Sequence, residues 1–324
     1  MQITDNVYFY KGRGEEKIIR GAGSCNVVVL KTDRQVMFDT GLIIGGSFRD
    51  LEQAAVADGL DLSQTRAVLH THSHWDHIIG DCIVQGKHGA KVYAHPWEKP
   101  IVESQEAGFK AMILDVGGFY SEVFGLPPFL FRLLLRYVGG TYGGIRVDEL
   151  LNGGEELDFP LKIVACHTPG HSPGHMGYYV PEEKVFVGGD LIDLETGTGA
   201  DLNNPHSDYP DGLASLEKVR ELDIEYFLPA HGEPVRGKDE VRNLLDAMIE
   251  NTHGYIKDIS GFLSEREGTL TEMENELMPG TPFTLKAMKM MQILTTLKYM
   301  QEQGSVNLQK KGNKFSWSLA TKAA

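Results

Sequence analysis

The sequence predicts an α+β protein, and three features of the chain indicate this class. The first forty residues alternate between short apolar runs and turn residues, which is typical of β-strands. An order of strand, turn, helix and strand follows, and it recurs over residues 161–229. After Gly237 the strand patterns stop, and three helical patterns lead into a hairpin pattern. Strands mixed with helices, followed by a mainly helical block, favour an α+β architecture.

The composition places the chain among globular proteins. Its 324 residues predict one large or two modest domains, at about 150 residues per domain. With 41% hydrophobic and 23% charged residues, the composition disfavours a disordered, collagen-like or coiled-coil protein. Asp and Glu number 45 against 31 Lys and Arg, and the net charge of −14 argues against nucleic acid or an anionic membrane as the main partner.

The cysteines and the absence of sorting patterns indicate a cytoplasmic protein. Cys25, Cys82 and Cys166 are scattered and form no CxxC pair, so we expect a reducing compartment and no disulfide framework. The N-terminal residues lack the layout of a signal peptide. The longest apolar stretch, residues 123–138, is too short and too interrupted to span a membrane.

The elements of the first half follow from local patterns. Residues 47–59 have the apolar spacing of a helix. One predicted strand ends at Asp39, in a tight turn that contains Gly41. The predicted strands are short apolar runs bounded by turn residues, at residues 7–10, 26–30, 35–39, 67–70 and 91–95.

Residues 98–150 interrupt this alternation with a Gly-rich, aromatic and apolar segment. Helices are expected within it over residues 101–114 and 129–138. Two interpretations stay open with equal weight. The segment is either an insertion or lid over a functional site, or additional cover for the protein core.

The C-terminal part differs in both pattern and charge. A hairpin that turns at Gly312-Asn313 is expected near the end of the chain. Residues 286–324 carry seven Lys and Arg against one Asp or Glu. We therefore expect a first domain of residues 1–238 and a small winged-helix-like domain of residues 239–324. The helices predicted in the second domain cover residues 239–264, 269–277 and 283–303.

A dense group of histidines follows one of the predicted strands. Imidazoles and carboxylates packed this closely would desolvate or repel one another unless a cation organised them, so packing alone is the disfavoured explanation. Neutral imidazole and carboxylate are the usual ligands of Zn²⁺ and related metals. His70 still belongs to the strand, and we expect a structural role for it. The histidines and the aspartate of this group are His70, His72, His74, Asp76 and His77.

Further candidate ligands stand where other apolar runs end. They are His171, Asp190 and His231, and Asp39 has a similar place after an earlier strand. The ends of neighbouring strands meet at one edge of a sheet, where α/β folds place their sites. We therefore expect these residues to converge with the histidine group on a single metal site.

Five motifs carry a family resemblance. FDTG, HSHWDH, TPGHSPGH, VGGD and PAHG occur in this order within residues 1–237, and in sequence and order they resemble the metallo-β-lactamase superfamily. The resemblance implies an αββα sandwich, in which two mixed sheets lie between layers of helices. The segment after residue 238 is similar to the winged-helix-like domain of the glyoxalase II and lactamase-beta-2-like branch.

The resemblance also implies two divalent metal ions, with Zn²⁺ preferred and Fe or Mn as alternatives. The implied ligands of the first ion are His72, His74 and His171, and those of the second are Asp76, His77 and His231. Asp190 would bridge the two ions, and Asp39 would support the site from behind the ligands.

Differences from other branches of the superfamily narrow the range of expected activities. Asp190 stands where the best-known zinc β-lactamases have cysteine, which disfavours antibiotic hydrolysis. His74 stands where the flavodiiron oxidoreductases have glutamate, which argues against oxygen reduction. His175 is similar to a second histidine of glyoxalase II-like members, and we expect it to bond within its own loop. Trp75 is expected to pack on the floor of the site.

The implied reaction is hydrolysis by a metal-bound hydroxide, in which Asp190 fixes the metal spacing and Asp76 accepts a hydrogen bond from the hydroxide. The first hypothesis is an ester, thioester or lactone hydrolase acting on a small acyl substrate. Its acyl chain would be buried by Phe109, Phe129 and Phe131, among other residues. A phosphodiesterase or ribonuclease is the alternative, and a non-catalytic signalling module is the least favoured. A homodimer is left open.

Overall fold

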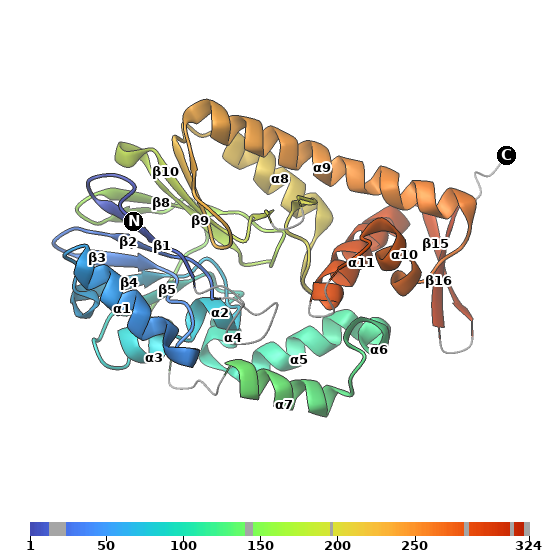
Figure 1. Cartoon of the computed structure of the whole chain (residues 1–324), viewed down its shortest axis with the longest axis horizontal. Helices are drawn as coiled ribbons and strands as arrows, with labels where there is room; N and C mark the ends of the chain where they lie inside the picture. The colour runs from blue at the N-terminus through green and yellow to red at the C-terminus, as the bar shows by residue number, and fades with distance from the viewer. Residues whose placement is uncertain (13–23, 140–144, 195–196, 282–284, 312–313, 321–324) are drawn as a thin grey trace.

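The structure is a computed structural model that describes residues 1–12, 24–139, 145–194, 197–281, 285–311 and 314–320. Within these residues, two six-stranded sheets lie face to face with helices outside them (Figure 1). The first sheet has the order β1 (Val7–Tyr10), β2 (Val27–Leu30), β3 (Gln35–Phe38), β4 (Thr65–Leu69), β5 (Lys91–Ala94) and β6 (Glu149–Leu150). The second has the order β14 (Val235–Arg236), β13 (Tyr226–Pro229), β10 (Val185–Gly189), β9 (Met176–Val180), β8 (Lys162–His167) and β7 (Glu156–Asp158). A separate small pair joins β11 (Ile192–Asp193) to β12 (Gly199–Ala200).

Parallel strands in each sheet bring their carboxyl ends to the same edge. β3, β4 and β5 run parallel, and Phe38 pairs with Leu69. β10 and β13 also run parallel, and Gly189 pairs with Pro229 after a shift in register. The residues that follow these strands therefore emerge side by side, although they are far apart in the sequence.

Apolar side chains fill the space between the two sheets. Phe9, Phe38 and Leu69 of the first sheet share one cluster with Tyr178 and Leu228 of the second. Each of these five is at most 1% exposed. Burying a large apolar side chain stabilises the fold by about 1.5–3 kcal/mol, so this layer holds the sandwich together.

Helices cover the outer faces of the sheets. α1 (Ser47–Ala57) buries Phe48 against the first sheet, which confirms the helix predicted there. α8 (Tyr209–Arg220) buries Leu216 against Phe186 of the second sheet. These layers confirm the predicted α+β class and the αββα sandwich. Short 3-10 segments lie at Ile44–Gly46, Leu62–Gln64, Gly117–Phe119 and Pro181–Glu183.

The predicted insertion is mainly helical. Its helices are α4 (Lys99–Glu103), α5 (Gln105–Val116), α6 (Tyr120–Phe124) and α7 (Pro128–Gly139). The helices expected over residues 101–114 and 129–138 are therefore confirmed, with a break at Ser104. The Ser104 hydroxyl accepts a hydrogen bond from the Ala107 N–H and so caps the start of α5.

The C-terminal part contains the three predicted helices and the strands of the predicted hairpin. A capping box between Thr269 and Glu272 fixes the start of the second helix. The predicted turn at Gly312-Asn313 lies outside the described residues, and the winged-helix comparison and the division at residue 238 stay predictions. No described helix is both long enough and apolar enough to cross a membrane. The elements are α9 (Lys238–Glu265), α10 (Leu270–Leu277), α11 (Lys286–Glu302), β15 (Val306–Lys311) and β16 (Lys314–Leu319).

The second half of the insertion shares one apolar cluster with the C-terminal elements. Phe119 and Val123 pack with Ile259 of α9, Leu294 of α11 and Trp317 of β16. Phe119 stacks on Trp317 with their ring centroids 6.0 Å apart. This half of the insertion therefore has the covering role that one of the two interpretations gave it.

Candidate metal centre

The strand ends bring the predicted ligands to one edge of the sandwich. The histidine group begins where β4 ends and runs into the short helix α2 (Trp75–Ile78), which α3 (Asp81–Val84) follows. His171 and His175 lie in the loop between β8 and β9. Asp190 directly follows β10, His231 follows β13 after one intervening residue, and Asp39 directly follows β3. Segments from both sheets therefore contribute to one site.

The first donor group joins His72, His74, His171 and Asp190, whose ligand atoms all lie within 4.8 Å of one another. Asp190 Oδ2 is 3.6 Å from His72 Nε2 and 3.4 Å from His171 Nε2. His171 Nε2 is also 3.1 Å from His74 Nδ1. The structure thus brings together the three histidines predicted for the first ion and the carboxylate predicted to bridge.

The second donor group consists of Asp76, His77 and His231, within the same limit of 4.8 Å. His231 Nε2 and His77 Nε2 lie 3.5 Å and 3.7 Å from Asp76 Oδ2. Each of these nitrogens also lies 3.6 Å from Asp190 Oδ1. One oxygen of Asp190 therefore faces each donor group, which is the position that a bridging ligand requires.

Three atoms at the centre of the two groups are buried without a hydrogen-bond partner: His72 Nε2, His77 Nε2 and Asp190 Oδ1. An unsatisfied buried polar atom costs about 1–3 kcal/mol, and folded proteins keep few of them. Divalent cations would satisfy these atoms, since imidazole and carboxylate are suitable ligands for them. The residues therefore fit the divalent metals that the resemblance implies.

The surroundings favour the ligand form of His72, His74 and Asp190, but not of the other three histidines of the donor groups. Burial and the neighbouring His77 lower the pKa of His72 well below its usual value. Burial and the nearby His171 lower the pKa of His74 to about 3. Burial alone would raise the pKa of Asp190, but the surrounding histidines outweigh it and hold that pKa well below its ordinary value. Neutral imidazoles beside an ionised carboxylate are the protonation states that bind a metal. Although burial lowers the pKa values of the other three histidines, nearby acidic groups outweigh it and raise the pKa of His77, of His171 and, to about 9, of His231, so these three must lose a proton when a metal binds.

Asp39 supports the site from behind the ligands. Its carboxylate accepts hydrogen bonds from the Thr71 N–H at 2.8 Å and the Thr71 hydroxyl at 2.7 Å, and lies 2.8 Å from His77 Nδ1. A carboxylate at Nδ1 orients the ring so that Nε2 faces the site. The left-handed backbone of Asp39 (φ 56°) is held by these contacts. His70 Nε2 lies 2.6 Å from Asp81, which gives His70 a structural position.

Two further buried groups contact the ligands. His175 Nδ1 lies 3.0 Å from the Thr168 hydroxyl of its own loop, as expected, but its Nε2 also accepts a hydrogen bond from the Asp190 N–H at 3.1 Å. The carbonyl oxygen of Asp201 accepts a hydrogen bond from His171 Nδ1 at 3.0 Å. Asp201 was missed by the sequence analysis, because it follows no long apolar run and belongs to none of the five motifs.

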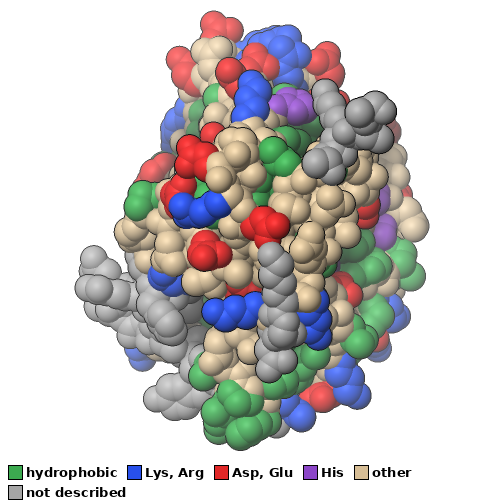
Figure 2. Space-filling view, turned by 90° about the vertical axis from the view of Figure 1, so that its right-hand side faces the viewer, with side chains coloured by type: hydrophobic (Ala, Val, Ile, Leu, Met, Phe, Trp, Pro, Cys, Tyr) green, Lys and Arg blue, Asp and Glu red, His purple; other side chains and the backbone are tan. Residues whose placement is uncertain are grey.

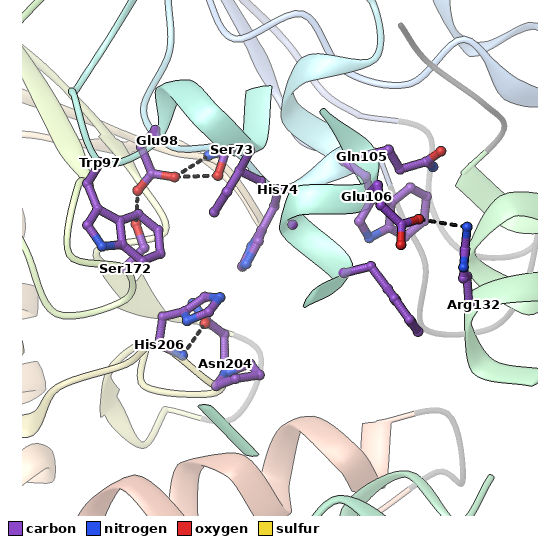
Figure 3. Close-up of a pocket in the computed structure, with 15 residues that line it drawn as sticks. Ser73, His74, Trp97, Glu98, Gln105, Glu106, Arg132, Ser172, Asn204 and His206 are labelled. Carbon is purple, nitrogen blue, oxygen red and sulfur yellow. Dashed lines mark hydrogen bonds and ion pairs between the residues drawn. The ribbon is translucent and has the colours of Figure 1, made fainter. Parts of the chain in front are cut away.

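An apolar pocket of about 130 Å³ opens beside His74 (Figure 3). The ligand segment, the insertion and the loop at residues 204–206 supply its walls. On the α7 side, Arg132 forms an ion pair with Glu106 at 2.7 Å and lies over the Phe109 ring. The pocket joins a predicted metal ligand to the first half of the insertion, which supports the lid interpretation for this half. Its apolar lining residues are Trp75, Trp97, Ile101, Phe109 and Pro205.

Of the three phenylalanines expected to bury an acyl chain, only Phe109 lines this pocket. Phe129 is 69% exposed, and Phe131 packs against Phe124 with ring centroids 4.5 Å apart. The prediction for Phe129 and Phe131 was therefore wrong, because apolar spacing identifies a helix face but not the segment that covers it. Figure 2 shows hydrophobic side chains gathered at the lower end of one face of the molecule, where Figure 1 places α6 and α7.

The three cysteines are free. A ligand atom of Cys25 lies within 4.8 Å of those of Asp39 and His77, but burial raises the pKa of its thiol to about 12. A neutral thiol is a poor metal ligand, so Cys25 is a packing residue beside the site. Cys166 is buried and Cys82 is half-buried, and neither belongs to a donor group among the described residues.

Comparisons with known proteins support a metal centre at this site. The family model described as the metallo-beta-lactamase superfamily matches residues 20–231. The chain is 22% identical over 279 residues to the probable metallo-hydrolase YqjP of Bacillus subtilis, which covers 79% of this chain and 81% of that protein. It is 31% identical over 247 residues to a linear primary-alkylsulfatase of Pseudomonas, of which it spans less than half: 67% of this chain matches 44% of the relative.

Solved structures agree at the level of the fold. A metallo-beta-lactamase family protein from Thermus thermophilus superposes with a TM-score of 0.75 at 20% identity, over 98% of this chain and 100% of that one. A beta-lactamase domain protein from Burkholderia ambifaria superposes with a TM-score of 0.72 at 16% identity, over 99% and 94% of the two chains. With the family match and the donor groups, these likenesses lead to one conclusion. The chain belongs to the metallo-beta-lactamase superfamily and is a metal-dependent hydrolase of that superfamily.

Proposed function

We propose that this hydrolase binds two divalent ions and cleaves a carboxylic ester, thioester or lactone with an apolar acyl group. The observation that carries the proposal is the apolar pocket with His74, a member of the first donor group, in its wall. A substrate in this pocket would have its apolar part near Trp97 and Phe109 and its scissile bond near the donor groups. Divalent cations, when bound there, lower the pKa of water and polarise the oxygen of an electrophile.

Different residues of the chain serve metal binding and proton handling. Asp190, with one oxygen facing each donor group, holds the two groups at a fixed spacing. The Asp76 side chain is 14% exposed, so its carboxylate can accept a hydrogen bond from an attacking water. The pocket walls exclude bulk water from the apolar part of the substrate, whose burial is favourable by about 0.8 kcal/mol per CH₂.

A linear alkyl sulfate is the second candidate substrate. The Pseudomonas relative bears the name of a linear primary-alkylsulfatase, and an apolar pocket suits an alkyl chain as well as an acyl chain. The two candidate substrates differ in the group that is attacked, an acyl group or a sulfate ester, but both carry an apolar chain that the pocket would bind. A long polyanion such as RNA is less favoured, because a net charge of −14 opposes the phosphate contacts on which its binding depends.

A substrate panel with the metal-loaded enzyme tests the proposal. p-Nitrophenyl esters of increasing acyl length, acyl thioesters and lactones are compared with alkyl sulfates, bis-p-nitrophenyl phosphate and single-stranded RNA. We expect kcat/KM for the esters to rise with acyl length. Turnover of alkyl sulfates alone would favour the second candidate. RNA cleavage that weakens with salt, without ester turnover, would overturn both.

Two phenylalanine variants separate the pocket from the rest of the insertion. Phe109→Ala is expected to lower kcat/KM for long-chain esters about tenfold, because it removes apolar contact worth about 1.4 kcal/mol, and to affect short esters little. Phe129→Ala is the matched control, since that side chain is 69% exposed on α7. Equal losses in the two variants would contradict the assignment of the pocket to the acyl chain.

A further inference from the structure

Glu98 is a buried carboxylate directly before α4. It is 1% exposed and lies in the wall of the apolar pocket. Its Oε2 accepts hydrogen bonds from the Ser73 N–H at 3.1 Å and from the Ser73 hydroxyl. Its Oε1 accepts a hydrogen bond from the Ser172 hydroxyl at 2.5 Å. Figure 3 shows both serines directed at the carboxylate, so donors from two separate segments occupy its two oxygens.

A carboxylate at this position is costly to the fold. Burial raises the pKa of Glu98, and the hydrogen bonds from Ser172 and Ser73 oppose that shift. A buried charged network can often be replaced as a whole by apolar residues of similar volume without loss of stability. The presence of a carboxylate is therefore better explained by the groups that it binds than by packing.

The groups that Glu98 binds adjoin the first donor group. Ser73 stands between two of its histidines, and Ser172 directly follows the third. One carboxylate thus connects the backbone segments that carry all three histidines. The second segment also closes on Glu98, because a Cβ at Gly174 would lie 2.8 Å from both its Cγ and its Oε1. The two segments therefore enclose the Glu98 carboxylate from both sides.

We infer that Glu98 is a positioning residue that holds these three histidines at the spacing a metal ion requires. The inference rests on the proposed metal-dependent function but not on the identity of the substrate. Groups that orient metal ligands typically contribute about 10- to 100-fold to metal affinity. Because Glu98 directly precedes α4, it also joins a wall of the pocket to the metal centre.

Competition with a chelator measures the metal affinity without a substrate. Glu98→Gln keeps the shape of the side chain but removes its charge and replaces one acceptor oxygen with an NH₂ group, which cannot accept the hydrogen bond that a serine donates there. We expect it to weaken binding of one ion by about tenfold or more, and to change the visible spectrum of the Co²⁺-loaded protein. Glu103→Gln is the matched control, because Glu103 lies at the end of α4, the helix that Glu98 directly precedes, and accepts a hydrogen bond from the Val147 N–H at 3.0 Å.

A purely structural role gives a different result. In that case Glu98→Gln lowers the unfolding temperature of the metal-free protein but leaves the metal Kd and the Co²⁺ spectrum unchanged, which overturns the inference. Ser172→Ala removes one donor and gives the same test if Glu98→Gln does not fold. In the double variant, Ser172→Ala should add little to the effect of Glu98→Gln. An unmodified chain that binds no metal would instead refute the proposed function itself.

Discussion

Asp190 lies between the two donor groups, and its oxygens are 3.4–3.6 Å from four histidine nitrogens. Asp190→Ala is expected to lose at least one ion and the hydrolytic activity, because two cations would then face each other without a negative charge between them. Elemental analysis of protein purified without chelators measures the loss. Asp223→Ala is the control, since that exposed carboxylate pairs with Lys184 and should leave the metal content unchanged.

His70→Ala is expected to retain the metal that Asp190→Ala loses, although His70 belongs to the same histidine group as several ligands. His70 Nε2 lies 2.6 Å from Asp81 Oδ2, and His70 belongs to neither donor group. Its removal leaves the buried Asp81 carboxylate without this partner, so we expect a stability loss of about 1–3 kcal/mol with both ions retained. Denaturant unfolding and metal analysis of the same sample test this. If His70→Ala lost metal while Asp190→Ala kept it, the ligand assignment would be wrong.

Among the elements, α11 contacts the segment beside the metal centre through Gln292. Gln292 is 2% exposed, accepts a hydrogen bond from the Leu202 N–H at 2.9 Å and donates one to the Ala200 carbonyl at 3.3 Å. Asp201 lies between these two residues, and its carbonyl oxygen accepts the hydrogen bond from His171. The C-terminal part of the chain therefore holds the segment that orients a predicted ligand.

Gln292→Ala should reduce stability and metal affinity together. The buried backbone groups of Leu202 and Ala200 would lose their partner, at a cost of about 1–3 kcal/mol, and the segment around Asp201 would loosen. Gln301→Ala, at an exposed position of the same helix, is the control. Unfolding curves and chelator competition give the two quantities. Lower stability with unchanged metal affinity would mean that Asp201 keeps its place without Gln292.

Most of the longer elements could be predicted from the sequence, because apolar spacing is a property of each segment alone, whereas the short helix α6 was not expected. α1 and α9 follow their predicted ranges within two residues at either end. The ligands of the donor groups could be found because they stand within motifs at strand ends. Glu98 and Asp201 could not, since their approach to the site depends on how distant segments pack. The exposure of Phe129 was missed for the same reason.

At the scale of the whole molecule, the two donor groups predict about two divalent ions per chain. A ligand that binds only the folded state stabilises it, by about 4 kcal/mol when its concentration is a thousand times Kd. Chelation is therefore expected to lower the unfolding temperature, and added metal to restore it. Elemental analysis and thermal unfolding check both points. Fewer than one ion per chain, not corrected by added metal, would contradict a binuclear site.

Removal of residues 240–324 would leave every residue of the two donor groups in the chain. It would, however, uncover Phe119 and Val123 and part of the second sheet's outer cluster, which α9, α11 and the hairpin help to bury. We expect the truncated protein to aggregate, because large exposed apolar patches promote association. The soluble fraction and size-exclusion chromatography measure this. A soluble, metal-loaded truncation would show instead that the C-terminal part is a separable domain.

The contact of Phe119 and Val123 with Ile259 and Trp317 limits how specificity can be exchanged between relatives. The second half of the insertion and the C-terminal helices form one packing unit built from two stretches of chain. α5 joins this unit to the pocket wall, because its Val116 belongs to the shared cluster and its Phe109 lines the pocket. A chimera that received a foreign residue 98–150 segment alone would meet host side chains of the wrong shape, at a cost of about 1–5 kcal/mol per misfit. Grafting a new pocket therefore requires transplanting both stretches, and in natural divergence they should change as a pair.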